Sequence, residues 1–212
     1  MPRPPRNILP NYPHHVTQRA SLGRDLFTEP RHVHKYKEFL GHSLRKHGLL
    51  LHAYCIMTNH VHLVVTPPTM RSLSDGIGVT HQKYARWLHM NEGEIGHSWK
   101  GRFHAAPMDL NHFVACIRYV EQNPLRAGIV KRAEDFRWSS VHGHSGVDKD
   151  ELLAEEKFSW MSQRDWIDWI NESVPESTYQ AIRIATLTRV PTWVVSEELS
   201  EDDDATPGIV WH

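Results

Sequence analysis

Residues 49–66 read LLLHAYCIMTNHVHLVVT, and this stretch decides the fold. Leu49–Met57 and Val61–Val65 are apolar runs of strand-forming residues. The polar pair Thr58-Asn59 between them is typical of a hairpin. The stretch therefore predicts two neighbouring antiparallel strands, the second and third along the chain.

Two histidines stand on one face of the second of these strands. Because side chains alternate along a strand, His60 and His62 point the same way, with Cα atoms roughly 7 Å apart from the strand rise. Both imidazoles can then bind one divalent cation. An isolated His-x-His pair is about as often two solvent-facing polar residues, and two ligands leave a metal site incomplete. The pair needs support from elsewhere in the chain.

The elements around the hairpin alternate between strand and helix. We expect strands at 14–19 and 102–108, and helices at 31–47, 72–90 and 111–121. Pro124 should end or kink the last helix. This order predicts an α+β sandwich with a mainly antiparallel sheet of split βαβ type.

The C-terminal third differs in composition from the rest of the chain. Residues 141–149 are rich in Gly and His and are interpreted as a linker, with small helices at 164–171 and 177–187 beyond it. Residues from Glu197 onward are acidic and predicted to be disordered. We therefore divide the chain into a main domain at 1–146, a small helical extension at 147–196 and an acidic tail at 197–212.

The charges are distributed unevenly. Residues 1–150 contain 20 Lys and Arg against 12 Asp and Glu, whereas residues 151–212 contain 4 against 13. A basic body attracts a polyanion such as nucleic acid.

The only cysteines, Cys55 and Cys116, lie in apolar segments, which favours buried thiols in a reducing compartment. With no apolar stretch that could cross a membrane or serve as a secretory signal, we expect a cytoplasmic protein with no membrane partner.

A second constellation occurs in residues 118–124, RYVEQNP. Helical spacing places Tyr119 and Asn123 one turn apart on the same face. If this helix packs on the sheet face that carries the histidines, Asn123 can complete the metal site and the Tyr119 hydroxyl can face a phosphate. The structural alternative is a packing tyrosine and an asparagine that ends the helix. Tyr84, the main competing nucleophile, belongs to the apolar stripe of its own helix.

Five ordered blocks together resemble the REP-associated tyrosine transposases, single-tyrosine members of the HUH endonucleases related to insertion-sequence transposases. These blocks are Tyr12–Arg19, Ala53–Val64, Gly96–Phe103, Arg118–Gly128 and Trp138–Ser140. They span most of residues 8–142. Two departures from the family pattern, Thr58 in place of a proline and the variant stretch Ser98–Lys100, do not touch the inferred chemistry.

The resemblance implies a ferredoxin-like fold and a specific set of site residues. It assigns His60 and His62 to the metal, Asn123 to the position of a third ligand, and Tyr119 to the nucleophile. It further implies Mg²⁺ or Mn²⁺ as cofactor and single-stranded or hairpin DNA from palindromic repeats as substrate. The expected activity is strand cleavage and transfer through a 5′-phosphotyrosine link, in a protein that associates with the nucleoid when bound to DNA.

Phosphate contacts are expected from basic side chains near these blocks. They are Arg102, Arg118, Arg126, Lys131 and Arg132. Relatives include monomers and homodimers, so the resemblance does not decide the oligomeric state. Two alternatives remain at this point: a DNA-binding or regulatory protein on the same fold that no longer cuts, and a metal hydrolase that uses water and does not need Tyr119.

Overall fold

The computed structural model describes residues 7–93, 95–154, 161–174 and 177–195. Its strands are β1 (His14–Arg19), β2 (Leu50–Ile56), β3 (His60–Thr66) and β4 (His104–Pro107). The longer helices are α1 (Pro30–His47), α2 (Val79–Glu92), α3 (Leu110–Glu121), α6 (Gln163–Asn171) and α7 (Ser177–Thr188). Short helical turns are η1 (Ser21–Gly23), η2 (Ser74–Gly78), α4 (Asn123–Arg126), η3 (Ala133–Asp135) and α5 (Val141–His144).

The four strands form one sheet in the order β2-β3-β1-β4, and every neighbouring pair is antiparallel. β1 and β2 both pair with β3, while β3 and β4 both pair with β1. Each helix between such strands therefore completes a split βαβ unit. The predicted ferredoxin-like α+β sandwich is confirmed, including the hairpin at residues 49–66.

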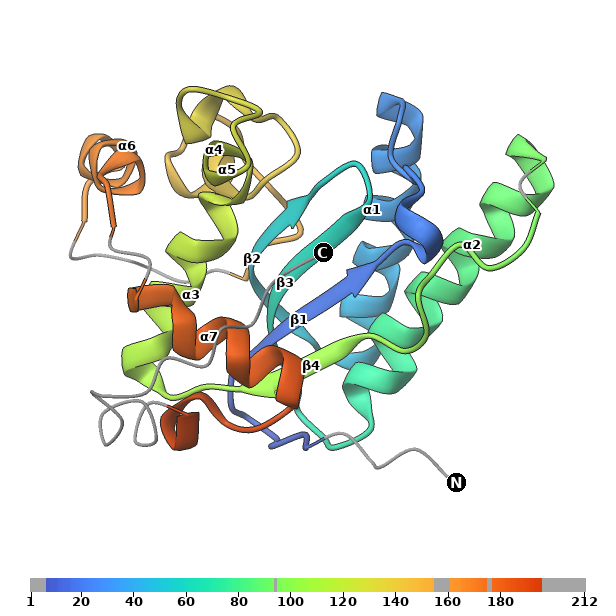
Figure 1. Ribbon diagram of the computed structural model, residues 1–212, viewed down its shortest axis with the longest axis horizontal. Helices are drawn as coiled ribbons and strands as arrows, with labels where there is room; N and C mark the ends of the chain where they lie inside the picture. The colour runs from blue at the N-terminus through green and yellow to red at the C-terminus, as the bar shows by residue number, and fades with distance from the viewer. Residues whose placement is uncertain (1–6, 94, 155–160, 175–176, 196–212) are drawn as a thin grey trace.

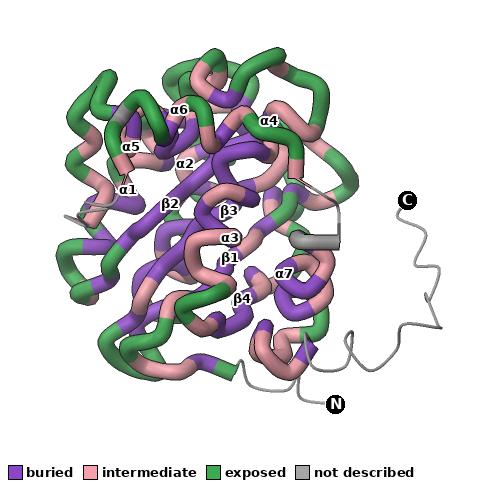
Figure 2. The backbone as a smooth tube through the Cα atoms, turned by 90° about the vertical axis from the view of Figure 1, so that its left-hand side faces the viewer, coloured by how far each residue is buried: buried purple, intermediate pink, exposed green. Residues whose placement is uncertain are grey.

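Helices cover both faces of the sheet (Figure 1), with α1 and α2 on one side and α3 and α7 on the other. Side-chain alternation divides β3 accordingly. Val61, Leu63 and Val65 join the core beneath α1 and α2, whereas Val64 joins a second core with α3 residues. Figure 2 shows the edge strand β2 and its neighbour β3 as mostly buried. The second core matters for function, because it fixes α3 against the histidine face of β3.

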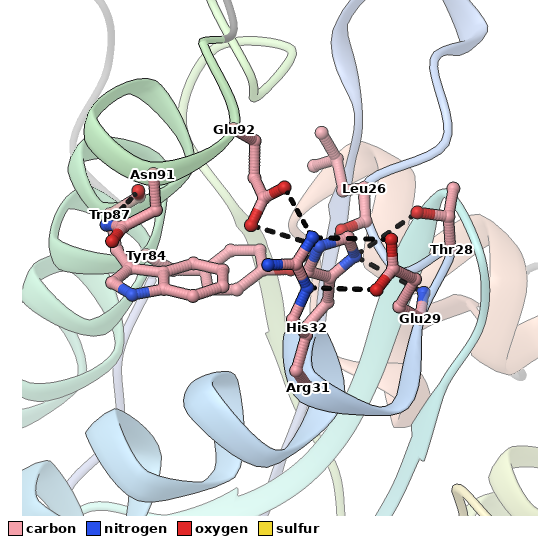
Figure 3. A network of polar contacts seen from close by, with 9 residues as sticks. All are labelled: Leu26, Thr28, Glu29, Arg31, His32, Tyr84, Trp87, Asn91 and Glu92. Carbon is pink, nitrogen blue, oxygen red and sulfur yellow. Dashed lines mark hydrogen bonds and ion pairs between the residues drawn. The ribbon is translucent and has the colours of Figure 1, made fainter.

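The helix α1 begins and ends where its sequence predicts. Pro30 occupies its first turn, the Glu29 amide donates to Nδ1 of His32 at 3.3 Å, and Gly48 ends it at φ 61°. Arg31 then bridges Glu29 and Glu92, at 2.9 Å each, which ties the start of α1 to the end of α2 (Figure 3).

Tyr84 lies beside this network as a core residue. Its side chain is fully buried, its ring stacks on Phe27 at 5.0 Å, and its hydroxyl donates to the Leu26 carbonyl at 2.7 Å. The prediction that Tyr84 belongs to the apolar core is confirmed.

Two predicted elements differ from the structure in instructive ways. The helix expected from residue 72 contains a π-helical turn over Ser74–Gly78. Within this turn Gly76 lies close to Leu49, where a Cβ would clash at 2.6 Å. The prediction of a linker at 141–149 is wrong for its first half. Residues Val141–His144 form α5, and Val141 is buried in the second core.

The helical extension is present as α6 and α7, within a residue or two of the predicted bounds. α7 contacts β1, β4 and α3. Cys55 and Cys116 are free and buried, as expected. The predicted disordered tail at 197–212 lies outside the described residues. Within the described ranges, no helix combines the length and apolarity needed to cross a membrane.

The environment of His14 predicts that acid weakens the fold. Its Nδ1 donates to the Tyr12 carbonyl at 2.7 Å, and its Nε2 accepts from the Leu9 amide at 3.1 Å. Burial lowers the pKa of His14 from 6.5 to about 4. Between these values the unfolded chain binds a proton that the folded chain does not, so the free energy of unfolding falls as pH falls through this window.

We expect His14 alone to contribute a loss of up to about 3 kcal/mol near pH 4. Urea unfolding of the metal-free protein from pH 7 to pH 4.5 measures this effect. The variant His14→Gln, which has no titrating ring, should lose less stability over the same range. An equal loss in the variant would contradict the assignment.

Candidate metal and tyrosine site

The histidine pair of β3 faces the layer formed by α3 and α7. His60 and His62 have ring centroids 5.0 Å apart and lie opposite Arg19 and Thr17 of the neighbouring strand β1. Alternation along β1 also brings His15 to this face. The adjacent strands β1 and β3 therefore present one polar cluster to the same side.

A pocket of about 410 Å³ opens over this cluster. The sheet and helices α3, α4 and α7 all contribute to its lining, which consists of His15, Thr17, Arg19, His60, His62, Tyr119, Asn123, Arg183, Thr186 and Leu187. The structure thus brings together all four residues predicted for the metal and the nucleophile.

His60 is oriented by its sequence neighbour. Its Nδ1 lies 2.7 Å from Oδ1 of Asn59, an acceptor, so the ring nitrogen donates and Nε2 keeps its lone pair. Burial, followed by the charge of Arg19, lowers the pKa of His60 to about 4. The ring is therefore neutral near pH 7, which is the form that binds a metal.

His62 contacts a second histidine. Its Nδ1 lies 2.9 Å from Nε2 of His15, and Nδ1 of His15 lies 2.7 Å from the Thr186 hydroxyl on α7. Burial lowers the pKa of His15 to about 3 and holds the pKa of His62 well below its ordinary value. Both rings are neutral, so each carries a hydrogen on one nitrogen only.

Asn123 is placed to supply an oxygen. Its Nδ2 donates to the Tyr119 carbonyl at 3.1 Å, which leaves Oδ1 as the acceptor of a residue that lines the pocket. In the ranges that the structure describes, no three His, Cys, Asp or Glu side chains gather to hold a metal ion. A set of two imidazoles and one amide oxygen suits a divalent cation that keeps further positions for water or phosphate.

Tyr119 lies against the histidines from the α3 side. Its ring meets those of His15 and His62 edge-on, with centroids 5.5 and 5.8 Å away, and the residue is 7% exposed. Burial raises the pKa of the Tyr119 phenol, while the charge of Arg126 and a hydrogen bond from it act in the opposite direction. The phenol is thus held at the pocket, beside a cation that favours its ionised form.

Three arginines contribute positive charge around the tyrosine and the pocket. The guanidinium groups of Arg126 and Arg183 lie 5.0 and 5.7 Å from the centre of the Tyr119 ring. Arg19 lines the pocket from β1. Arg126 and Arg183 are half-buried and Arg19 is exposed, so a polyanion that entered the pocket would meet positive charge both inside it and at its edge.

The basic residues predicted to contact DNA are spread over several parts of the molecule. Arg126 lies at the site, but Arg118 donates to the Trp169 carbonyl at 2.5 Å and stacks on that indole, so it joins α3 to α6. Arg102 lines a separate cavity with Gln18 and Trp99. Lys131 and Arg132 are exposed, and Arg132 pairs with Glu134 at 2.5 Å.

The sequence analysis missed Arg19, His15, Arg183 and Thr186. Alternation along residues 14–19 could have placed His15 and Arg19 on one face with the histidine pair. Nothing in the helical pattern of residues 177–187 indicates that Arg183 and Thr186 reach this pocket, because that depends on how α7 docks on the sheet.

Residues 10–123 match the family described as transposase IS200 like, which covers more than half of the chain. The chain belongs to this family and is an enzyme that acts on DNA. The predicted relationship to single-tyrosine transposases is confirmed.

A solved structure shows the same architecture. A REP-associated tyrosine transposase bound to a REP hairpin superposes with a TM-score of 0.56 at 15% identity, covering 74% of this chain and 99% of that one. A putative transposase from Deinococcus radiodurans R1 gives a TM-score of 0.40 at 16% identity, covering 57% of this chain and 97% of the other. No curated protein matches the chain.

Proposed function

We propose that the protein nicks and rejoins single-stranded or hairpin DNA at palindromic repeats, with Tyr119 as the nucleophile and a divalent metal at His60, His62 and Asn123. The main support for the proposal is that the Tyr119 side chain lies against the histidine pair of β3. Its ring packs against His62 in a pocket that Asn123 also lines. Mg²⁺ and Mn²⁺ both suit the mixed nitrogen and oxygen ligands.

The chemistry begins with attack of the Tyr119 oxygen on phosphorus. A new oxygen–phosphorus bond forms, the bond from phosphorus to the 3′ oxygen breaks, and the phenolic proton is lost while the leaving 3′ oxygen gains one. The bound metal would polarise the scissile phosphate. The product is a 5′-phosphotyrosine and a free 3′-hydroxyl. Because the covalent link conserves the phosphodiester, a second 3′-hydroxyl can reverse the step without ATP.

Arg126 supports this role of Tyr119. A phenol with an ordinary pKa of about 10 is a poor nucleophile near pH 7, and burial disfavours its ionised form further. The charge and hydrogen bond of Arg126 act against that burial effect. Arg19 and Arg183 are candidates to hold the phosphate that Tyr119 attacks.

Repeat hairpins are the proposed substrate because a protein of this fold is known with a REP hairpin bound. Such a substrate would place the enzyme in the cytoplasm, at the nucleoid. We propose residues 1–146 as the catalytic domain and 147–196 as an extension whose helix α7 lines the pocket. Lys131 and Arg132, both exposed, remain candidates for phosphate contacts outside the pocket.

The test is incubation of the purified protein with end-labelled hairpin DNA from repeats beside its gene, with Mg²⁺, Mn²⁺ or EDTA. Denaturing electrophoresis should show a protein–DNA adduct and a shortened strand with metal, and neither with EDTA. Metal-dependent nicking without any adduct would favour water as the nucleophile. Tight binding without nicking in either metal would favour a DNA-binding protein that does not cut.

A further inference from the structure

Thr186 and His15 form a hydrogen-bonded chain that ends at His62. We propose that this chain is a positioning device: it holds His62 with hydrogen on Nδ1 and so presents the lone pair of Nε2 to the metal. The inference rests on the proposed function, which makes His62 a metal ligand. It concerns His15 and Thr186, which are not among the proposed metal ligands. It assigns a role in the metal site to a residue of the C-terminal extension.

The Thr186 side chain on α7 determines which atom donates in each of these hydrogen bonds. The Thr186 hydroxyl donates to the Ile182 carbonyl at 2.7 Å, one turn earlier in the helix. A hydroxyl has a single hydrogen, so towards His15 the Thr186 oxygen is an acceptor. Nδ1 of His15, 2.7 Å away, must then carry the hydrogen.

The next step follows from the surroundings of His15. Its ring is 1% exposed, and its two nitrogens contact a hydroxyl and an imidazole rather than a carboxylate, so a neutral ring is the form that this site accommodates. A neutral imidazole that donates from Nδ1 has only a lone pair on Nε2. The 2.9 Å contact with Nδ1 of His62 therefore requires His62 to donate. With hydrogen on Nδ1, His62 has its own lone pair on Nε2, the nitrogen that remains for a metal.

Burial keeps water from replacing these contacts. His15 is 1% exposed, Thr186 is 3% exposed and His62 is 5% exposed. The His15 and His62 rings are also nearly parallel, at 10° with centroids 5.2 Å apart, so neither can turn without losing the other. A buried donor or acceptor left without a partner costs about 1–3 kcal/mol, which favours the arrangement that satisfies every group.

His60 reaches the same tautomer by an independent route. Nδ1 of His60 donates to Oδ1 of Asn59, whereas Nδ1 of His62 donates to Nε2 of His15. Two neighbouring histidines thus both direct Nε2 away from their partners. Metal-bound histidines have such outer hydrogen bonds as a rule, and loss of one typically weakens metal binding or activity by 10- to 100-fold.

The test compares Thr186→Val, which keeps the side-chain shape but removes the hydroxyl, with Thr186→Ser, which restores it. Thr188→Val is the matched control, because Thr188 makes the same backbone contact on α7 but is exposed. Long-range ¹H–¹⁵N spectra of the metal-free proteins report the tautomer of His62. Calorimetry reports the affinity for Mn²⁺ alone.

In the unmodified protein, Thr186→Ser and Thr188→Val, we expect His62 with hydrogen on Nδ1. In Thr186→Val we expect a mixture of tautomers and an Mn²⁺ affinity lower by about 10-fold. Hydrogen on Nε2 of His62 in the unmodified protein would overturn the inference, as would a Thr186→Val protein with unchanged tautomer and affinity. If the unmodified protein binds no Mn²⁺, the proposed metal site fails, and the tautomer spectra still decide whether the chain orients His62.

Discussion

Replacement of Tyr119 by phenylalanine is expected to abolish the protein–DNA adduct and to reduce strand cleavage by about 10⁴-fold or more, the scale seen when a nucleophile is removed from an enzyme. The phenyl ring can keep its edge contacts with His15 and His62, so the fold and the metal site should survive. Binding of hairpin DNA should therefore change by less than about threefold, since the lost hydroxyl is not its main anchor. Denaturing electrophoresis and a binding titration measure the two effects.

Tyr179 provides the matched control for this experiment. Its ring lies 5.2 Å from that of Tyr119, but its hydroxyl donates to the Gln122 side chain at 2.9 Å. Burial raises its pKa to about 12. The variant Tyr179→Phe should form the adduct at a near-normal rate. If it loses the adduct while Tyr119→Phe keeps it, the nucleophile has been misassigned.

Removal of either metal-site histidine is the second large effect. His60→Ala or His62→Ala should weaken Mn²⁺ binding and cleavage by at least about 100-fold, more than the loss of an outer partner. Each substitution leaves two of the three proposed ligands, so a high metal concentration should restore part of the cleavage. Calorimetry and cleavage rates across a metal titration measure both effects.

His42→Ala serves as the control for the histidine variants, because His42 is exposed on α1, across the sheet from the pocket. It should change neither metal affinity nor rate. If His62→Ala cleaves DNA with an unchanged metal requirement, the metal binds at a site that does not include His62.

The sheet and the centre of the site could be predicted because short-range patterns determine them. Strand 14–19 and the hairpin follow from runs of strand-forming residues between turns. The shared face of His60 and His62 follows from alternation, and the spacing of Tyr119 and Asn123 from the helical period. What brings the two pairs together is the second core, in which Val64 of β3 packs with Ile117 and Val120 of α3.

The remaining features depend on contacts distant in sequence. Thr186 and His15 are 171 positions apart in the sequence, so no local pattern predicts their hydrogen bond. The sequence predicts Arg118 as a phosphate contact, yet its guanidinium binds Trp169 and Glu172 of the extension. Residues 141–149 resemble a linker because they are rich in Gly and His, yet Val141 is buried in the second core and begins a helical turn.

The most direct test of the central claim is to find the atom to which DNA becomes attached. The adduct formed with Mn²⁺ and hairpin DNA would be digested with nuclease and protease, and the modified peptide sequenced by mass spectrometry. We predict a nucleotide joined through its 5′ phosphate to Tyr119, and no modified peptide when EDTA replaces the metal. Attachment at Tyr179 or any other residue, or metal-dependent cleavage with no modified peptide, would contradict the account.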